Sequence, residues 1–262
     1  MTTILAPAKI NLCLRVGERR ADGFHRVATL FAAIGLHDRI QLEPADETVV
    51  EGFGEDTLVR RALEALGETR RVRLEKRIPV AAGLGGGSSD AAAVLRALRG
   101  RRPVAELYEI ARGLGSDVPF FLSGLETALG TGRGDVLQPL PDFPRSYGIV
   151  LVPSATGLST ADVYSACTPN PIFAAARGDL IRGVHTAHSA LDVAGLVAND
   201  LQPAALGLRP ELAESLDALR SAGALAAAVS GSGPTVFGIF ADADAARLAG
   251  DRIAGSIVTS PV

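Results

Sequence analysis

The chain of 262 residues contains no tryptophan, one methionine and two cysteines, Cys13 and Cys167. Two cysteines so far apart offer neither the spacing of a structural metal site nor a disulfide framework. We therefore expect a cytoplasmic protein whose two thiols are buried and unreactive. The missing tryptophan also removes the largest stacking side chain from any ligand site.

Long apolar runs and an excess of positive charge are missing as well. No run of 18 apolar residues occurs, so we expect no membrane span, and the first residues lack the features of a signal peptide. The formal net charge of −3 gives no reason to expect a nucleic-acid partner. With 47% hydrophobic and 21% charged residues, the composition is typical of a globular protein of one large or two ordinary domains. Composition does not decide the oligomeric state.

Lysine is nearly absent, because 24 of the 26 basic residues are arginine. The two lysines, Lys9 and Lys76, both lie in stretches that resemble motifs. Chance is a sufficient explanation for either of them alone. Lys76 stands two residues before a glycine-rich loop, where it either reaches a bound nucleotide or extends to solvent.

That glycine-rich loop is the most informative stretch, and it runs from Pro79 through Val80, Ala81, Ala82, Gly83, Leu84, Gly85, Gly86, Gly87 and Ser88 to Ser89. An alternating segment over 72–78 predicts a strand before it, and good helix formers over 91–98 predict a helix after it. Glycines let a backbone approach an anion closely, and a helix start offers free N–H groups. The pattern favours phosphate binding.

Other interpretations of the loop remain open at this point. It is no Walker A loop, because no Gly-Lys-Ser/Thr follows, and it comes close to a dinucleotide fingerprint with serine in the last position. A flexible turn is the alternative without function.

Two stretches near the N-terminus carry polar side chains beside predicted strands. Alternation from Ile10 to Val16 predicts a half-buried strand, on which Lys9 and Asn11 share a face. Phe24 and His25 follow a turn signal, where a ring and an imidazole can stack on and bind a planar ligand. Spacing alone favours ordinary strand and core residues in both stretches.

Asp117 stands in a connection before the apolar run 118–122. An aspartate at that place is normally the N-cap of a helix. Its alternative role is a carboxylate at the edge of a pocket, available as a general base.

The remaining pattern indicates an α+β protein. Helices are predicted over 57–66 and 242–254 and after Pro103 and Pro210, and strands over 26–43, 124–140, 147–153, 224–229, 235–240 and 256–260, with His37-Asp38 as a turn. Three prolines over 139–144 suggest a domain boundary, giving domains 1–141 and 142–262.

Three stretches together resemble the GHMP kinase superfamily: Pro7–Leu12, Pro79–Ser89 and Ser230–Pro234. Within it the chain is most similar to the 4-diphosphocytidyl-2-C-methyl-D-erythritol kinases, through Asp22–His25 and Gly115–Phe120 as well. The resemblance implies a two-domain α+β fold. Its N-terminal domain resembles the second domain of a small-subunit ribosomal protein and carries the ATP loop and catalytic pair. Its C-terminal domain is ferredoxin-like and completes the substrate site.

The resemblance also implies a reaction and its residues. ATP and Mg²⁺ would phosphorylate the 2-hydroxyl of a CDP-linked methylerythritol in the non-mevalonate isoprenoid pathway, with residues 79–89 as the ATP loop. Asp117 matches the base of the family and Lys9 its catalytic partner. Asn11, Phe24, His25 and Tyr164 match substrate-binding positions. The Mg²⁺ ligands are not evident, with Ser88 and Ser89 as candidates.

Two departures from the family pattern stand out. Phe24 replaces the usual tyrosine and loses its hydroxyl, and Asp56-Thr57-Leu58 replaces the usual Asp-Asn-Leu near the adenine site.

Three other functions stay open. They are another GHMP-type kinase of the homoserine or mevalonate class, a non-catalytic nucleotide-binding module, and a dinucleotide-binding oxidoreductase. The last needs an acidic residue about 20 positions after the loop at a strand end. Glu106 and Glu109 fall near that distance, but on a predicted helix.

Overall fold

The computed structural model describes residues 2–53, 57–154 and 156–262. The chain forms two compact units, each assembled from separate stretches of sequence. Unit 1 comprises Met1–Ala8, Leu36–Val80 and Gly85–Leu125, and unit 2 comprises Lys9–Gly35, Ala81–Leu84 and Glu126–Val262. The predicted domains 1–141 and 142–262 are contiguous in sequence, and that division stays a prediction.

Two long strands, β1 (Thr2–Arg19) and β2 (His25–Pro44), pair with each other and contribute residues to both units. The predicted turn between them is confirmed, with Gly23 at a positive φ of 85°. The prediction of a half-buried β1 is wrong, because residues 9–14 are buried on both faces. The second face is covered where the amide of Asn11 donates to the Thr29 hydroxyl, which in turn donates to a backbone carbonyl of β1.

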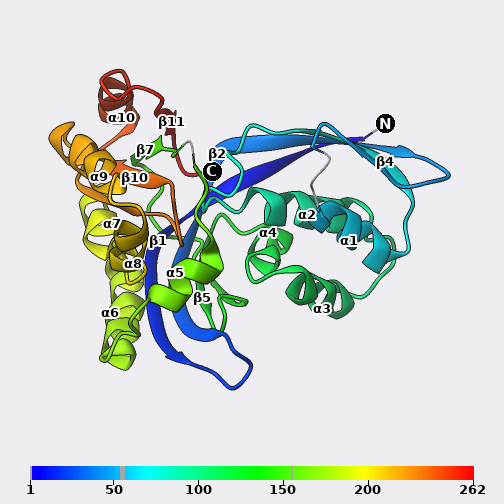
Figure 1. Ribbon diagram of the computed structural model, residues 1–262, viewed down its shortest axis with the longest axis horizontal. Coiled ribbons are helices and arrows are strands. Elements are labelled where there is room, and N and C mark those ends of the chain that lie inside the picture. The colour runs from blue at the N-terminus through cyan, green and yellow to red at the C-terminus, as the bar shows by residue number, and fades with distance from the viewer. Residues whose placement is uncertain (1, 54–56, 155) are drawn as a thin grey trace. The chain divides into compact units, whose positions relative to one another are not determined.

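Unit 1 places a group of helices beside strands β2 and β4 (Figure 1). Strand β4 pairs antiparallel with β2 and parallel with β3. Helix α2 is rich in alanine and buried over most of its length, which lets it pack closely against α1 and α4. The elements completing this unit are β3 (Val49–Glu51), α1 (Thr57–Leu66), β4 (Arg70–Glu75), α2 (Gly86–Ala97), α3 (Val104–Leu114) and α4 (Val118–Ser123).

The predicted turn at His37-Asp38 is wrong, because β2 continues through both residues. Asp38 is fully buried, and its Oδ1 accepts hydrogen bonds from the backbone N–H groups of Arg77 and Ile78 at 2.6 and 2.9 Å. A polar pair that normally marks a turn is therefore part of a strand here, since the carboxylate finds its partners inside the protein.

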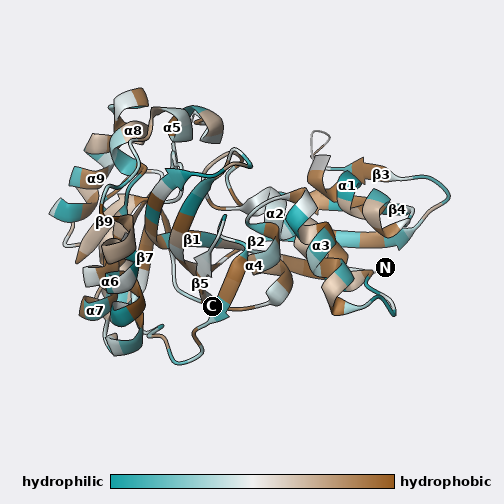
Figure 2. Ribbon diagram, turned by 90° about the horizontal axis from the view of Figure 1, so that it is seen from below, coloured by the Kyte–Doolittle hydropathy of each residue, from teal (hydrophilic) through white to brown (hydrophobic). Residues whose placement is uncertain are grey.

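Unit 2 contains an antiparallel sheet of four strands in the order β11-β7-β10-β9. Helices α9 and α10 pack on it, and α9 carries both apolar and polar segments (Figure 2). Its elements are β5 (Thr127–Thr131), β6 (Val136–Pro139), β7 (Gly148–Val152), α5 (Thr160–Ala166), α6 (Phe173–Thr186), α7 (Ala190–Leu196), β8 (Ala198–Asn199), α8 (Gln202–Leu208), α9 (Leu212–Ser221), β9 (Ala226–Val229), β10 (Val236–Phe240), α10 (Ala243–Gly250) and β11 (Ile257–Thr259).

The α+β character predicted from the sequence is confirmed by both units. The predicted helix over 57–66 matches α1 to the residue, and Gly67 follows at a φ of 62°, as a helix-ending glycine should. Ser159 caps α5 by accepting a hydrogen bond from the backbone N–H of Asp162. No helix in the described part of the chain is long and apolar enough to cross a bilayer.

We expect Leu219→Ala to destabilise the protein strongly. Leu219 is fully buried in the apolar cluster that α9 shares with β7, β9 and β10. Truncating such a side chain typically costs about 2–5 kcal/mol. The matched control is Leu208→Ala, since Leu208 is 43% exposed, and its expected cost is below about 1 kcal/mol. Urea denaturation measures both, and equal losses would contradict the assignment of this core.

Candidate active site

Residues 81–84 of the glycine loop pack against the C-terminal loop 230–234 in unit 2. A Cβ on Gly83 would lie 2.3 Å from the backbone oxygen of Ser230, and Gly83 has a φ of 76°. Only glycine satisfies both the contact and the dihedral angle. The N–H of Thr235 also donates to the carbonyl of Ala82 at 3.2 Å. The two glycine-rich motifs therefore meet within one unit.

The Lys9 side chain ends at this junction. Its Nζ lies 2.6 Å from Oδ1 of Asn11 and 2.9 Å from the carbonyl oxygen of Gly83, and the residue is only 3% exposed. The Lys9 backbone N–H donates to the carbonyl of Leu84 at 3.0 Å. The ordinary alternative of an exposed strand lysine is therefore wrong.

The side chain of Asn11 holds the Lys9 ammonium in place. Its Oδ1 accepts from the ammonium, while its Nδ2 donates to the Thr29 hydroxyl at 2.8 Å. The Asn11 backbone N–H lies 3.4 Å from the Ser230 hydroxyl. These contacts fix both rotamers, and the predicted contact of Asn11 with substrate stays a prediction.

The second half of the loop opens helix α2 in unit 1. The N-cap is Gly85 at a φ of 72°, no side chain caps the helix, and its first turn has no acidic residue. Residues 86–90 belong to the helix, so it begins five residues earlier than the predicted span 91–98. An uncapped N-terminus without negative charge is suited to a phosphate group.

Ala81 adds backbone strain to the same loop. It has a φ of 52°, the only positive value for a non-glycine residue in the described part of the chain. Such a conformation costs about 1–3 kcal/mol and is typical of ligand-binding loops.

Asp117 lies at the start of α4 in unit 1 and is half-buried. Its backbone has helical angles, and its carboxylate makes no capping hydrogen bond to α4 within the described range 57–154. Asp117 is therefore the N-cap residue by position, as considered from the sequence, but its side chain does not cap α4. Because Lys9 belongs to unit 2, the pairing of Lys9 with Asp117 stays a prediction.

Lys76 does not extend to solvent, and its contact with a bound nucleotide stays a prediction. Its Nζ lies 2.5 Å from Oδ2 of Asp38 and 2.6 Å from Oδ2 of Asp90, and both aspartates are fully buried. Burial alone lowers the pKa of Lys76, but Asp90 and Asp38 outweigh it and raise that pKa above its ordinary value. Since Asp90 follows the serines of α2, this ion triad fixes the start of the helix to β2 and β4. Neither aspartate was identified from the sequence, although the scarcity of lysine singled out Lys76.

Three of the predicted substrate residues, Phe24, His25 and Tyr164, belong to unit 2, and two of them are in contact. The ring centroids of His25 and Tyr164 are 5.6 Å apart, and Nδ1 of His25 lies 2.9 Å from the carbonyl oxygen of Gly17. A carbonyl oxygen only accepts, so Nδ1 carries the proton, and Nε2 of the neutral ring remains an acceptor. Phe24 is 50% exposed, with the Arg133 guanidinium 4.8 Å from its ring centroid.

The other candidates from the sequence are less informative. Both cysteines are free, Cys13 is buried as predicted, and burial raises its pKa to about 11. Cys167 is half-buried rather than buried, and burial together with Asp200 raises its pKa, so neither thiol is activated. Asp56, on the predicted adenine side, lies outside the described residues.

The geometry also excludes the dinucleotide-binding alternative. Glu106 and Glu109 lie on helix α3, where they pair with Arg102 and Arg112. Strand β4 precedes the loop and pairs with β2 and β3, whereas β5, the next strand after α2, pairs with β2 and β6. A dinucleotide-binding unit instead pairs the two parallel strands that its helix connects.

Comparison with known proteins decides the family. The pattern of the GHMP kinases N-terminal domain matches residues 57–125, and that of the GHMP kinases C-terminal region matches residues 181–256. A 4-diphosphocytidyl-2-C-methyl-D-erythritol kinase of Pelotomaculum thermopropionicum is 46% identical, over 94% of this chain and 91% of the relative. The chain belongs to this family of GHMP kinases.

Solved structures separate the fold of the GHMP kinases from the narrower family. A crystal structure of 4-(cytidine 5'-diphospho)-2C-methyl-D-erythritol kinase aligns over 100% of both chains, with a TM-score of 0.76 and 38% identity. A homoserine kinase from Cytophaga hutchinsonii aligns with a TM-score of 0.71 over 99% of this chain and 94% of its own, but at 20% identity. That second likeness shows the fold alone. The α+β GHMP fold expected from the sequence is confirmed.

We expect Lys76→Met to destabilise the kinase, because it leaves Asp38 and Asp90 buried without their cation. Breaking a buried pair in this way typically costs about 3–5 kcal/mol. The matched control is the neighbouring Arg77→Met, whose side chain is 59% exposed and pairs with Glu75 at the surface. Such a pair is worth about 0–1 kcal/mol. Urea unfolding compares the two, and similar losses would contradict the role of the triad.

The same triad predicts a dependence on alkaline pH. Because the folded pKa of Lys76 is raised, its contribution is complete below the ordinary lysine pKa and is lost as pH rises through the folded value. The difference in unfolding free energy between wild type and Lys76→Met should therefore shrink above about pH 10.5.

Proposed function

We propose that this kinase transfers the γ-phosphoryl group of ATP to the 2-hydroxyl of 4-diphosphocytidyl-2-C-methyl-D-erythritol, giving the 2-phosphate and ADP. The identity of 46% to a kinase of that name over nearly the whole of both chains carries the proposal. The fold alone would not, because a homoserine kinase has it too. The product belongs to the non-mevalonate route to isoprenoid precursors.

ATP is the phosphoryl donor, and residues 79–89 are its proposed binding loop. The uncapped start of α2 presents backbone N–H groups and the positive end of a helix dipole to the phosphates. The loop is held by Gly83 against the backbone of Ser230, so its backbone is ordered before ATP arrives. Binding then costs less conformational entropy.

Asp117 is the proposed base and Lys9 its catalytic partner. Asp117 accepts the proton of the 2-hydroxyl while that oxygen forms a bond to the γ-phosphorus and the bond to the ADP oxygen breaks. The ammonium of Lys9 stabilises negative charge that develops during the transfer. The support for these roles is the match to the family motifs and the contacts that hold the Lys9 ammonium in place.

Mg²⁺ is the proposed metal, with Ser89 as the better of the two serine candidates. The Oγ of Ser89 is buried without a hydrogen-bond partner in the described part of the chain, which fits a group that gains a ligand later. The described residues contain no cluster of three His, Cys, Asp or Glu side chains, so most ligands would come from the phosphates and water. When bound, Mg²⁺ neutralises phosphate charge.

Cytosine recognition is assigned to His25, Phe24 and Tyr164. With its Nδ1 proton donated to Gly17, His25 offers Nε2 as an acceptor. The exocyclic amine of cytosine is a donor, whereas uracil has a carbonyl oxygen at that place. Phe24 and Tyr164 supply aromatic faces for stacking, and Phe24 does so without the hydroxyl of the usual tyrosine. A cytoplasmic location and the absence of nucleic-acid and membrane partners remain proposals from the composition.

The proposed reaction predicts a clear choice among alcohols. Incubated with ATP and Mg²⁺, the protein should release ADP with 4-diphosphocytidyl-2-C-methyl-D-erythritol and give no turnover with homoserine or mevalonate. A coupled assay for ADP measures this. Turnover with homoserine or mevalonate, but not with the CDP-linked alcohol, would support the alternative GHMP-type kinase.

The proposed base predicts that Asp117→Asn binds ATP normally but turns over about 10²–10⁴ times more slowly, since general-base catalysis is typically worth that factor. Calorimetry measures ATP affinity and the ADP assay measures kcat. The control is Asp142→Asn, an exposed aspartate outside the motifs, which should keep wild-type kcat. A fully active Asp117→Asn would remove Asp117 from the role.

A further inference from the structure

The segment 157–160, which leads into helix α5 in unit 2, contacts both glycine-rich loops. A Cβ on Gly157 would lie 3.4 Å from the Cβ of Ala81, so the Gly157 backbone packs next to the Ala81 methyl group. A Cβ on Gly233 would lie 3.8 Å from Cδ2 of Leu158. The segment therefore touches the ATP loop as well as the C-terminal loop.

A hydrogen bond between two hydroxyl groups completes this junction. The Oγ1 of Thr160, the first residue of α5, lies 2.9 Å from the Oγ of Ser232 in the C-terminal loop. Ser232 is only 7% exposed, so without Thr160 its hydroxyl would have little water to bind instead. The start of α5 is thereby attached to the loop that packs against Gly83.

Helix α5 buries little surface of its own. Of its seven residues, all of which the structure describes, only Val163 is buried. Tyr164 is partly buried and packs against the same apolar cluster as Val163. A short helix that buries so little surface has a low local stability. The position of Tyr164 therefore depends on the contacts that hold the start of the helix.

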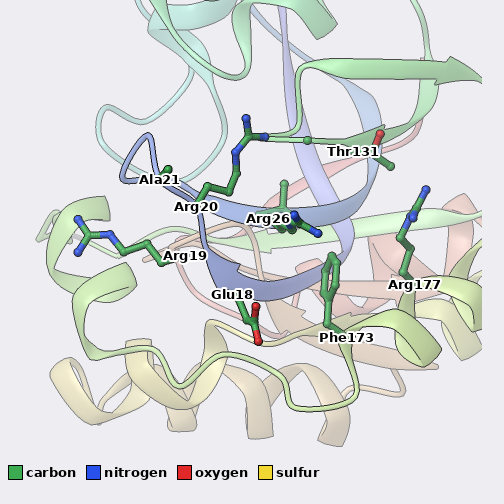
Figure 3. Close-up of a pocket in the computed structure, with 10 residues that line it drawn as sticks. Glu18, Arg19, Arg20, Ala21, Arg26, Thr131, Phe173 and Arg177 are labelled. Atoms are coloured by element: carbon green, nitrogen blue, oxygen red, sulfur yellow. The ribbon is translucent and has the colours of Figure 1, made fainter.

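The other half of the proposed nucleobase site is held more firmly. His25 lies on β2, and its Nδ1 donates to the carbonyl of Gly17 on β1. The Gly17 backbone is covered by the ring of Phe173, which Figure 3 shows beside β1, at the start of the helix that also carries Arg177. Of the two rings whose centroids lie 5.6 Å apart, that of Tyr164 therefore belongs to the less stable element.

We propose that the junction at 157–160 couples the two substrate sites, so that a nucleotide on the ATP loop strengthens binding of the CDP-linked alcohol, and the reverse. This inference rests on the proposed function, because it takes the ATP loop and the nucleobase residues as the two binding sites. Coupling between two sites is reciprocal by thermodynamic necessity.

The physical basis is the order that the first ligand imposes. A nucleotide that fixes the loop around Ala81 also fixes the surface on which Gly157 and the start of α5 rest. Tyr164 is then ordered before the nucleobase arrives, so binding of the second ligand loses less conformational entropy. Ser232 and Thr160 are positioning residues, because they act through α5 and not on the reacting atoms.

Calorimetric titration with the CDP-linked alcohol, with and without saturating ADP and Mg²⁺, tests the coupling. ADP is the probe because it lacks the γ-phosphoryl group that would meet the alcohol directly, and because no turnover occurs. For the wild type, ADP should tighten binding of the alcohol about fivefold or more. The alcohol should tighten binding of ADP by the same factor.

Variants of the hydroxyl pair show whether the coupling passes through the junction. Ser232→Ala and Thr160→Val should each reduce it to less than about twofold, whereas Thr160→Ser, which keeps a hydroxyl group, should retain it. The matched control is Ser165→Ala, an exposed hydroxyl on the same helix, which should show the coupling of the wild type. Because the coupling is a ratio of two affinities of one variant, a variant that merely binds the alcohol more weakly leaves it unchanged.

The proposal is overturned if ADP leaves the affinity of the wild type for the alcohol unchanged. It is also overturned if both Ser232→Ala and Thr160→Val keep the full coupling, since the ligands would then affect each other directly. A failure of the proposed function is a different result, in which the alcohol neither binds nor leads to ADP release from ATP. That result would overturn the coupling together with the kinase assignment.

Discussion

The contact between Gly83 and the Ser230–Gly233 backbone is the constraint on which the candidate site of unit 2 depends. A Cβ at position 83 would lie 2.3 Å from one carbonyl oxygen and 2.9 Å from another, so no other residue fits without moving the backbone. The carbonyl of Gly83 also accepts from the Lys9 ammonium and from the Ser230 hydroxyl. One peptide group thus joins the N-terminal motif, the glycine-rich loop and the C-terminal loop. Three short motifs, far apart in sequence, are parts of one structure because of it.

The two lysines of this chain differ in the groups that surround their ammonium ions. Lys9 is held by neutral oxygens of Asn11 and Gly83, and its proposed role is to act on a charge brought by substrate. Lys76 lies between two buried carboxylates, and its charge is balanced by them. Arginine replaces lysine almost everywhere else in the chain, but its broad planar group is less suited to lying between two oxygen atoms in a confined space. A compact ammonium group therefore fits both sites better than a guanidinium group does.

Much of the fold followed from the sequence, and the failures have physical causes. The helix over 57–66 was predicted to the residue, because its apolar spacing and Gly67 are local signals. The turn at His37-Asp38 failed, since only the fold shows that Lys76 and two backbone N–H groups surround that carboxylate. The half-buried β1 failed for a related reason, because alternation does not reveal that Thr29 covers its polar face. At the site, motif residues were found from the sequence, but Asp38, Asp90 and the Gly17 carbonyl were not, since each acts through a contact distant in sequence.

Gly17 shows how a residue without a side chain can fix the positions of two others, His25 and Phe173. Its carbonyl sets the tautomer of His25, and its bare Cα carries the ring of Phe173. Any side chain at this position would displace that ring, and with it the helix turn that presents Arg177. The imidazole of His25 and the ring of Phe173 are therefore both positioned by one backbone segment of β1.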